Sequence, residues 1–504
     1  MSVDTAGVTP YELNREPTAA GMIDELVFAR LRRLGIRPAR PASDSAFLRR
    51  ASLGIIGTLP TAAEARAFLS DASPTKRRDL VEGLLAREEY ADYWAMRWCD
   101  ALRVKAEFPI NLWPNAVQAY HRWVRTCLRD NVRYDRFARE LLTASGSNFR
   151  VAPVNFYRAL QGRGPEPVAR VVALTLMGAR ADRWPPARLR GMAAFFSRIA
   201  YKPTGEWKEE IVQHDGSKGP VTGAAFPDGT RAVIAPGRDP REAFAAWLTA
   251  PGNPWFASAA VNRVWAWMFG RGIVHEPDDI RPGNPPGNPE LLAHLERSFV
   301  ASGYDLRGLI RTIALSSTYQ LSCVRRSASP AAESQFAFYP LRRLDAEVLI
   351  DAINQITGTT ESYSSAIPEP FTFIPERVRS IALADGSITS SFLQMFGRPA
   401  RDTGMFSERN NSATAAQRLH LLNSSHIRNK IERGPAMLAI TRSARPDHES
   451  VETLYLTMLS RSPTEGERAA VGQHLATAGR PGRSQAMVDL AWALLNSPEF
   501  LFRH

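Results

Sequence analysis

Cysteine, lysine and long apolar runs are scarce in this chain of 504 residues, and each scarcity excludes a class of protein. The three cysteines lie far apart and form no C-x-x-C or C-x-x-C-H motif, so no covalent haem and no zinc site are indicated. No run approaches the ~18 apolar residues of a membrane-spanning helix, so no span is expected. The first residues show neither a basic nor an apolar stretch, and no signal peptide is visible.

The positive charge of the chain comes almost wholly from arginine. Only six of the 63 basic residues are lysines, and the formal net charge is +12. The arginines are scattered along the sequence, so the charge does not predict nucleic-acid binding. The sequence also lacks a P-loop, a dinucleotide-binding glycine fingerprint, a G-x-S-x-G motif and an H-E-x-x-H motif. Their absence removes the commonest nucleotide, hydrolase and metalloprotease hypotheses, and no cofactor is evident.

Helical periodicity dominates the sequence and predicts a mainly α fold. Between Ile23 and Leu34 apolar residues recur every three or four positions, as on one face of a helix. Asp44 is the expected N-cap of the next helix. Thr61 begins a Thr-x-x-Glu capping box, and the pattern recurs at Thr464. Further helices are predicted over residues 76–86, 88–104, 114–129, 134–143, 165–178, 187–200, 239–250, 255–268, 289–302, 305–315, 342–356, 412–432, 447–460, 465–478 and 483–496.

A short β element interrupts the predicted helices between Glu206 and Pro236. The stretches EEIVQHD and TRAVIAP alternate as strands do, and Gly-Ser-Lys-Gly and Pro-Asp-Gly are turn signals. A hairpin or a ribbon of two or three strands is expected there. The predicted organisation is two helical domains joined by this small ribbon, with an N-terminal extension (1–21), a first helical domain (22–200), the β linker (201–237) and a second helical domain (238–504).

The segment NPWFASAAVNRVWAWMFGRGIVHEPDDI, residues 253–280, sets polar groups among aromatic ones. Asn262, Arg263 and Trp265 lie in the middle of its predicted helix. Buried polar groups without hydrogen bonds cost roughly 2–7 kcal/mol, so these must be paired. The segment therefore predicts either an organised polar site or a structural cluster of polar groups.

Asp278 and Asp279 follow in HEPDDIRPGNPPGNP, a loop rich in proline, glycine and asparagine. Such a loop can fold carboxylate and carbonyl oxygens around calcium, which takes about 6–8 oxygen ligands. The alternative is that either aspartate pairs with Arg271 or Arg281 and fixes the loop. The sequence therefore leaves two hypotheses for this pair of aspartates, a Ca²⁺ site and an arginine-paired structural loop.

An arginine-rich loop, FGRPARDTGMFSERNNSATAAQRLHLLNS, is the strongest candidate for ligand binding. It contains Arg398, Arg401, Glu408 and Arg409 before a predicted helix. Guanidinium groups suit bidentate binding of carboxylate, sulfate or phosphate. We therefore expect an anion pocket at this loop, completed by the arginines at positions 263 and 343.

Two carboxylate-rich segments each permit a chemical and a structural interpretation. In EWKEEIVQHD, a strand would place Glu206, Glu210 and His214 on one face. These side chains could act as acid, base or metal ligands, or they could form a solvated surface. In LRRLDAEVLIDA, a helix would place Glu347 and Asp351 on one face. The flanking leucines predict that some of these charges are buried and paired.

The segment FPINLWPNAVQAYHRWV concentrates aromatic residues around Trp113 and Trp123. Exposed aromatic rings at this density could stack on sugar rings. A stripe of aromatics at helical spacing is more often part of a core.

Several of these segments resemble two paired planctomycete families, Domains of Unknown Function 1549 (cytochrome-associated) and 1553 (planctomycete-specific). The first resembles residues 47–71 and 76–103, FLRRASLGIIGTLPTAAEARAFLSD and KRRDLVEGLLAREEYADYWAMRWCDALR. The second resembles residues 253–280 together with STYQLS, LRRLDAEVLIDA, FGRPARDT and LHLLNS. In relatives the arginine-rich loop often carries Cys-x-Cys, where this chain has Met405 and Ser407, so thiol chemistry is not expected there.

The resemblance implies an exported or periplasmic protein, because relatives are usually exported and are linked with sulfatase-like proteins and polysaccharide use. We therefore expect binding or processing of acidic or sulfated glycans, and binding and catalysis both stay open. One alternative is a structural or assembly protein of the envelope. Another is a redox partner of a separate c-type cytochrome. The expected binding residues are Asn262, Arg263, Trp265, Arg343, Arg398, Arg401, Glu408 and Arg409.

Overall fold

The protein is mainly α-helical, as its sequence predicts. The computed structural model describes residues 9–504 except 373 and 376, and this part of the chain forms 21 α-helices and two small antiparallel sheets. The helices of the first half are α1 (Met22–Arg33), α2 (Asp44–Ile55), α3 (Ala62–Ser70), α4 (Lys76–Leu85), α5 (Glu88–Ala101), α6 (Pro114–Arg129), α7 (Tyr134–Thr143), α8 (Pro165–Met177) and α9 (Pro186–Ala193).

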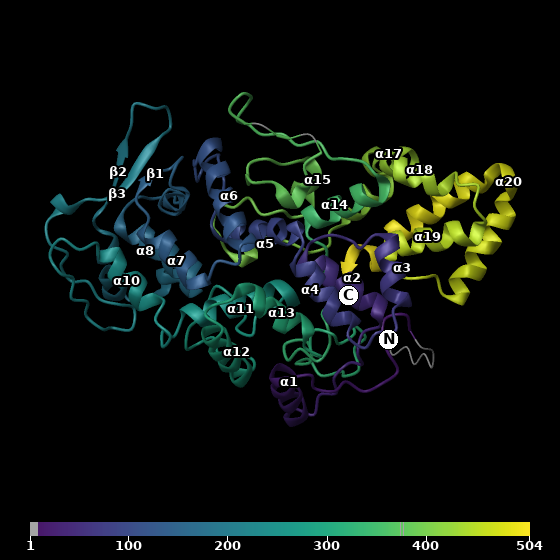
Figure 1. Ribbon diagram of the computed structural model, residues 1–504, viewed down its shortest axis with the longest axis horizontal. Helices are drawn as coiled ribbons and strands as arrows, with labels where there is room; N and C mark the ends of the chain where they lie inside the picture. Colours follow the sequence, from purple (N-terminus) through teal and green to yellow (C-terminus); the bar gives the residue numbers. More distant parts are fainter. Residues whose placement is uncertain (1–8, 373, 376) are drawn as a thin grey trace.

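The second half is also helical and ends in a group of helices at one side of the molecule, drawn in yellow in Figure 1. Its longest helix, α20, consists of two helical stretches joined at a kink, where Gly479 has a non-helical backbone, in agreement with the two helices predicted over 465–478 and 483–496. The helices of this half are α10 (Pro240–Leu248), α11 (Phe256–Phe269), α12 (Pro289–Ala301), α13 (Leu306–Leu315), α14 (Ala346–Thr357), α15 (Ser391–Met395), α16 (Ala415–Asn423), α17 (Ser425–Arg433), α18 (Pro435–Thr441), α19 (Asp447–Leu459), α20 (Glu465–Leu495) and α21 (Pro498–Leu501).

The larger sheet contains the predicted hairpin. Strands β2 (Ile199–Pro203) and β3 (Glu210–His214) pair antiparallel, and β1 (Gly146–Ser147) pairs with the other edge of β3. The third strand therefore comes from upstream of the hairpin, whereas the predicted strand in TRAVIAP contributes only an isolated bridge at Arg231. Figure 1 shows this sheet at the end of the molecule opposite α20.

Local capping explains several helix boundaries. Thr61 and Thr464 both form complete capping boxes with the glutamate three residues later, as predicted. Ser43, not Asp44, is the N-cap of α2, since its hydroxyl accepts the backbone N–H of Ala46. The predicted helix over 412–432 is broken at Ser424, which caps α17.

The predicted helix at 342–356 begins four residues late. Arg342 and Arg343 form the short strand β4 (Arg342–Arg343), which pairs with β5 (Phe502–Arg503) near the C-terminus. The helix α14 starts only at Ala346. Figure 1 shows the C-terminus beside α2, where Arg50 Nε donates to the backbone oxygen of His504 at 2.9 Å.

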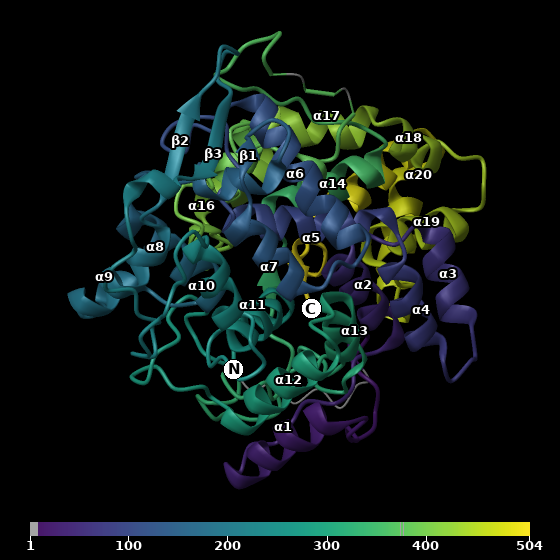
Figure 2. The ribbon, with the colours of Figure 1, turned by 60° about the vertical axis from the view of Figure 1, so that its left-hand side comes forward.

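Helix α5 lies at the centre of the molecule and links its two halves. Ten of its side chains are buried, and Trp98 packs edge-to-face against Trp267 of α11 with ring centroids 5.2 Å apart. Trp94 approaches the same ring at 5.9 Å. Figure 2 shows α14 on one side of α5 and α11 and α13 on the other. None of the described helices combines the length and the apolar character needed to cross a membrane.

Candidate functional site

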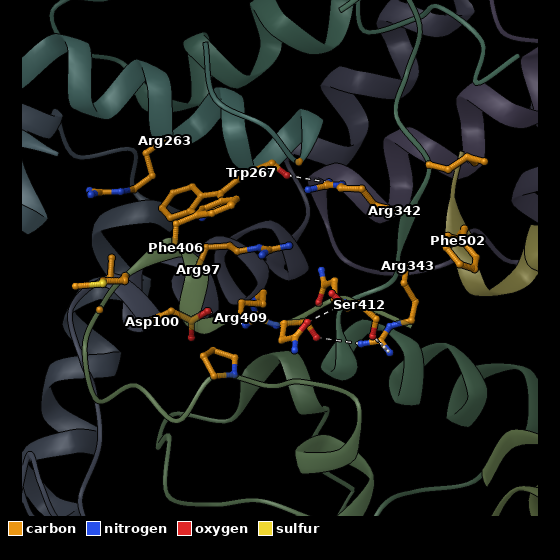
Figure 3. A pocket seen from close by; sticks show the side chains of 18 residues that line it. Arg97, Asp100, Arg263, Trp267, Arg342, Arg343, Phe406, Arg409, Ser412 and Phe502 are labelled. Atoms are coloured by element: carbon orange, nitrogen blue, oxygen red, sulfur yellow. Dashed lines mark hydrogen bonds and ion pairs between the residues drawn. The ribbon is translucent and has the colours of Figure 1, made fainter. Parts of the chain in front are cut away.

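A pocket of ≈ 380 Å³ opens where α5, α11, β4, β5 and the arginine-rich loop meet (Figure 3). The most distant of these residues, Arg97 and Phe502, are 405 positions apart in the sequence, so the fold alone assembles the pocket. Its described wall consists of Arg97, Asp100, Ala101, Arg263, Trp267, Gly270, Leu341, Arg342, Arg343, Pro399, Gly404, Met405, Phe406, Arg409, Asn410, Asn411, Ser412 and Phe502.

The end of α11 shapes one side of this pocket. Gly270 follows the helix with φ +83°, and a Cβ there would lie 2.1 Å from Cδ of Arg342. Glycine is needed both for the left-handed backbone and for this close approach. Arg342 Nη2 donates to the backbone oxygens of Trp267 at 3.0 Å and Met268 at 3.3 Å, which holds β4 against the helix end.

Arginine–carboxylate pairs hold the floor of the pocket. Arg97 of α5 pairs with Asp345 and donates to the Tyr93 hydroxyl at 2.9 Å. Arg409 bridges Asp100 and Glu347, with both N–O distances 2.6 Å. Burial raises the pKa of Asp100, but the charges of the guanidiniums at positions 409 and 401 outweigh it and hold that pKa below its usual value.

Positive charge exceeds negative charge in this ion-pair network. Among the described residues, the arginines that line the pocket or share its carboxylates number eight, and the carboxylates number four. Arg342 and Arg343 pair with no described carboxylate and donate to backbone oxygens and to Gln417. Burial lowers the pKa of both arginines, as expected for uncompensated cations. The arginines are 97, 263, 342, 343, 398, 401, 409 and 503, and the acids are 100, 278, 345 and 347.

Unpaired polar atoms occur beside the pocket. The buried Nε atoms of Arg97, Arg343 and Arg409 have no hydrogen-bond partner in the described part of the chain. The same holds for the side-chain oxygen of Asn411, whose Nδ2 donates to Asp345 at 2.8 Å. Buried polar atoms without partners are uncommon in folded proteins.

Three of the predicted binding residues line the pocket. Arg263 donates to Asp278 at 3.0 Å and to the end of α8, with Leu174 oxygen at 3.0 Å. Arg343 holds the arginine-rich loop through the backbone oxygens of Ser412 and Asn410. Arg409 is the third.

The other predicted binding residues are structural supports outside the pocket wall. Arg401 is fully buried and joins Asp100 at 2.9 Å to the Ala384 oxygen at 2.8 Å. Arg398 lies 3.4 Å from Glu347 and donates to backbone oxygens behind the pocket. Glu408 accepts three backbone N–H groups, those of residues 402, 403 and 404, and so closes its own loop.

Two predicted residues of α11 serve the core instead. Asn262 is fully buried, and its side chain both donates to and accepts from the backbone of Val274, each at 2.9 Å. Trp265 is also fully buried and stacks on Phe269 with centroids 4.3 Å apart. These contacts correspond to the structural alternative for the polar groups of this segment.

Arginine pairs occupy both aspartates of the proposed calcium site. Asp278 accepts from Arg263 and from the backbone N–H of Phe406 at 2.5 Å. Asp279 accepts from Arg183 at 2.9 Å and Arg281 at 3.0 Å. Over residues 9–372, 374–375 and 377–504, no cluster of three or more His, Cys, Asp or Glu side chains is placed to hold a metal ion. The calcium hypothesis stays a prediction.

Arginine pairs hold Glu210, Glu347 and Asp351 of the two other candidate segments. Glu210 accepts from Arg158 at 2.9 Å and Arg163 at 2.6 Å, whereas Glu206 precedes the strand and does not share its face. Glu347 and Asp351 are buried on α14, as the flanking leucines predict.

Sequence reasoning missed Arg97, Asp100 and Trp267 as pocket residues. The two α5 residues are three apart and therefore share a helix face, but nothing in the sequence indicates which face meets the arginine-rich loop. Trp267 lies two residues after Trp265, or ~200° around the helix, which turns one ring to the core and the other toward the pocket.

Comparison with protein families agrees with the resemblance seen in the sequence. The model of the protein of unknown function DUF1549 (PSCyt2) matches residues 22–171, and that of DUF1553 (PSD1) matches residues 240–475. The chain belongs to these paired families. Both matched regions contribute to the pocket, DUF1549 through α5 and DUF1553 through α11, β4 and the arginine-rich loop. No curated protein and no solved structure matches the chain.

Proposed function

We propose that the pocket binds the sulfate or carboxylate group of an acidic sugar. The unbalanced charge supports this proposal, because Arg342 and Arg343 face the pocket without a described carboxylate partner. A sulfate or carboxylate accepts paired hydrogen bonds from guanidinium groups. It would also neutralise positive charge whose burial otherwise costs free energy.

The remaining wall favours an organic anion over a bare inorganic ion. Trp267, Phe406, Phe502 and Leu341 place apolar surface beside the arginines. The volume of ≈ 380 Å³ lies at the small end of the ~300–1,000 Å³ typical of ligand pockets. A single acidic sugar ring, with its charged group on the arginines and its carbon face on the aromatic rings, suits both properties.

Binding without acid–base catalysis is the simpler role for this pocket. Asp100 is the one acidic residue among the described lining residues, and its two oxygens accept from Arg401 and Arg409. Its lowered pKa keeps it ionised at neutral pH, so it is a poor proton donor there.

The test compares sulfated and desulfated forms of the same oligosaccharide by thermal shift and calorimetry. A ligand at 100 times its Kd should stabilise the protein by ~2.7 kcal/mol. Ser412 lines the pocket mouth and is exposed, and its hydroxyl makes no hydrogen bond to a described residue. We expect Ser412→Glu to weaken binding at least tenfold by charge repulsion and Ser412→Gln, of the same shape, to preserve it.

Equal binding of both sugar forms, or equal affinity of the Glu and Gln variants, would overturn this proposal. If neither form of the sugar binds and light scattering shows a stable oligomer, the envelope-assembly alternative would be favoured. Visible absorbance from a bound chromophore would favour the redox alternative. An envelope location and an association with sulfatase-like proteins belong to the same proposal and rest on the resemblance alone.

A further inference from the structure

A second and larger cavity shares no described lining residue with the arginine pocket. Its volume is ≈ 830 Å³, and four segments form it: the loop before α6, the stretch with Arg158 and Arg163 before α8, the β2–β3 turn, and the segment that includes Ile367. Figure 2 shows the β2–β3 turn meeting the green segment at the top of the molecule. We call this cavity the aromatic groove, defined by Phe108, Trp113, Trp207, Lys208, Glu107 and Glu206, with Phe371 beside it.

Large aromatic rings are left exposed in the aromatic groove. Trp207 is 60% exposed, Phe371 42% and Phe108 80%. Trp207 lies edge-to-face against Trp113 at 4.8 Å and against Phe371 at 5.1 Å, so the rings present faces in different directions. Exposed aromatic surface gathered at one cavity is typical of a ligand-binding groove.

Backbone strain coincides with the aromatic groove. Asn111, Trp113 and Lys208 all line it, and all have left-handed backbones, with φ of 60°, 73° and 62°. Asparagine adopts this conformation readily, but a bulky residue such as tryptophan rarely does. Strained residues of this kind persist where the surrounding structure holds them, and they cluster at ligand sites. Here the ammonium of Lys208 lies over both tryptophan rings, 5.1 Å from the centroid of Trp113 and 5.7 Å from that of Trp207.

The charges of the aromatic groove disfavour an anionic ligand. Four glutamates and three basic residues are among its described lining residues, and Glu210 already pairs with Arg158 and Arg163. Glu206 is exposed and forms no ion pair with a described residue. Glu107 also lines the groove without a described cationic partner, and its Oε1 accepts from the Ser365 hydroxyl and from the backbone N–H of Ala366 at 3.0 Å. Carboxylates without a cationic partner accept hydrogen bonds and repel phosphate or sulfate.

We propose that the aromatic groove binds a neutral oligosaccharide. Its sugar rings stack on Trp207, Trp113 and Phe371, and its hydroxyl groups donate hydrogen bonds to the carboxylates of Glu107 and Glu206. Sugar hydroxyls both donate and accept hydrogen bonds, so they match a wall that mixes carboxylates with Lys208. An extended peptide fits less well, because its carbonyl oxygens need donors where the groove offers mainly acceptors. The proposal does not depend on the arginine pocket.

The test is calorimetry of the full chain with a panel of neutral hexasaccharides, including glucans, xylans and mannans. We expect at least one to bind, Trp207→Ala to weaken it at least tenfold and Trp207→Phe to restore most of the affinity. Leu419→Ala is the matched control, since Leu419 is exposed to a similar extent (58%) on α16. The control should bind as the native chain does.

Absence of binding by every hexasaccharide would overturn the proposal, as would native affinity in Trp207→Ala. Stronger binding of a proline-rich peptide than of any sugar would also overturn it. Ser412→Glu separates the two sites, because we expect this variant to lose the acidic sugar while keeping the neutral hexasaccharide. Loss of the neutral ligand in Ser412→Glu would place it in the arginine pocket and refute the groove as its site.

Discussion

At the residue scale, the buried histidine His121 makes the stability of the protein depend on pH. Burial in α6, helped by the charge of Arg401, lowers its pKa from 6.5 to about 3. The unfolded chain therefore binds more protons between these values, and stability falls as pH drops from 6.5 toward 3. We expect His121→Leu to lose less stability than the native chain between pH 7 and 5, by up to ~2 kcal/mol. Urea unfolding at both pH values measures this, and identical pH dependence would contradict it.

A single glycine, Gly397, allows the arginine-rich loop to pack closely on itself. Gly397 has φ +86°, and a Cβ there would lie 1.8 Å from the backbone oxygen of Asn410, which also accepts from Arg343. We expect Gly397→Ala to destabilise the protein by more than the ~1–2 kcal/mol of a left-handed residue, because the clash is with backbone. Gly466→Ala is the control, since that helical position has open space and should be neutral or slightly stabilising. Equal thermal midpoints for the two variants would refute the close approach.

At the element scale, the capping box of α20 has a third member. Thr464 accepts the N–H of Glu467, and Arg461 pairs with Glu467 at 2.7 Å and with Glu499 of α21 at 2.7 Å. The hydrogen bond from Arg461 holds the pKa of Glu467 at about 2, so the box stays ionised at neutral pH. We expect Thr464→Ala to cost ~1 kcal/mol and Thr464→Ser to cost much less, as measured by denaturant unfolding. If Thr464→Ala leaves the free energy of unfolding unchanged, the arginine alone fixes the start of the helix.

Elements that depend on local signals could be predicted from the sequence, and elements that depend on distant partners could not. Periodicity and capping located most helices, including the box at Thr61, because these signals span a few residues. The helix predicted from residue 342 is wrong over strand β4, because the partner strand β5 lies about 160 residues later and leaves no local signal. The candidate site follows the same rule. Arg343 and Arg409 were identified by their chemistry, whereas Arg97 comes from α5, some 250 residues upstream of β4.

At the scale of the whole molecule, one buried carboxylate connects the two family regions. Asp345 pairs with Arg97 from the first region and lies within 4 Å of Arg409 and Arg503. Burial raises the pKa of Asp345, but these arginines, with Arg97 the largest influence, hold the pKa well below its usual value. The pair therefore contributes stability at neutral pH, which is lost as pH falls below the unfolded value near 4.

Asp345→Asn should accordingly destabilise the whole molecule and not one half of it. The change leaves buried guanidiniums from distant segments without their counter-charge, which typically costs about 3–5 kcal/mol. We expect unfolding to stay a single transition in near- and far-ultraviolet circular dichroism, with a lower denaturant midpoint and a weaker acid dependence. Glu290→Gln breaks the exposed pair with Arg33, which also joins distant segments, and should cost less than ~1 kcal/mol. Two separate transitions in Asp345→Asn would instead support the division into two helical domains and limit the network to a local role.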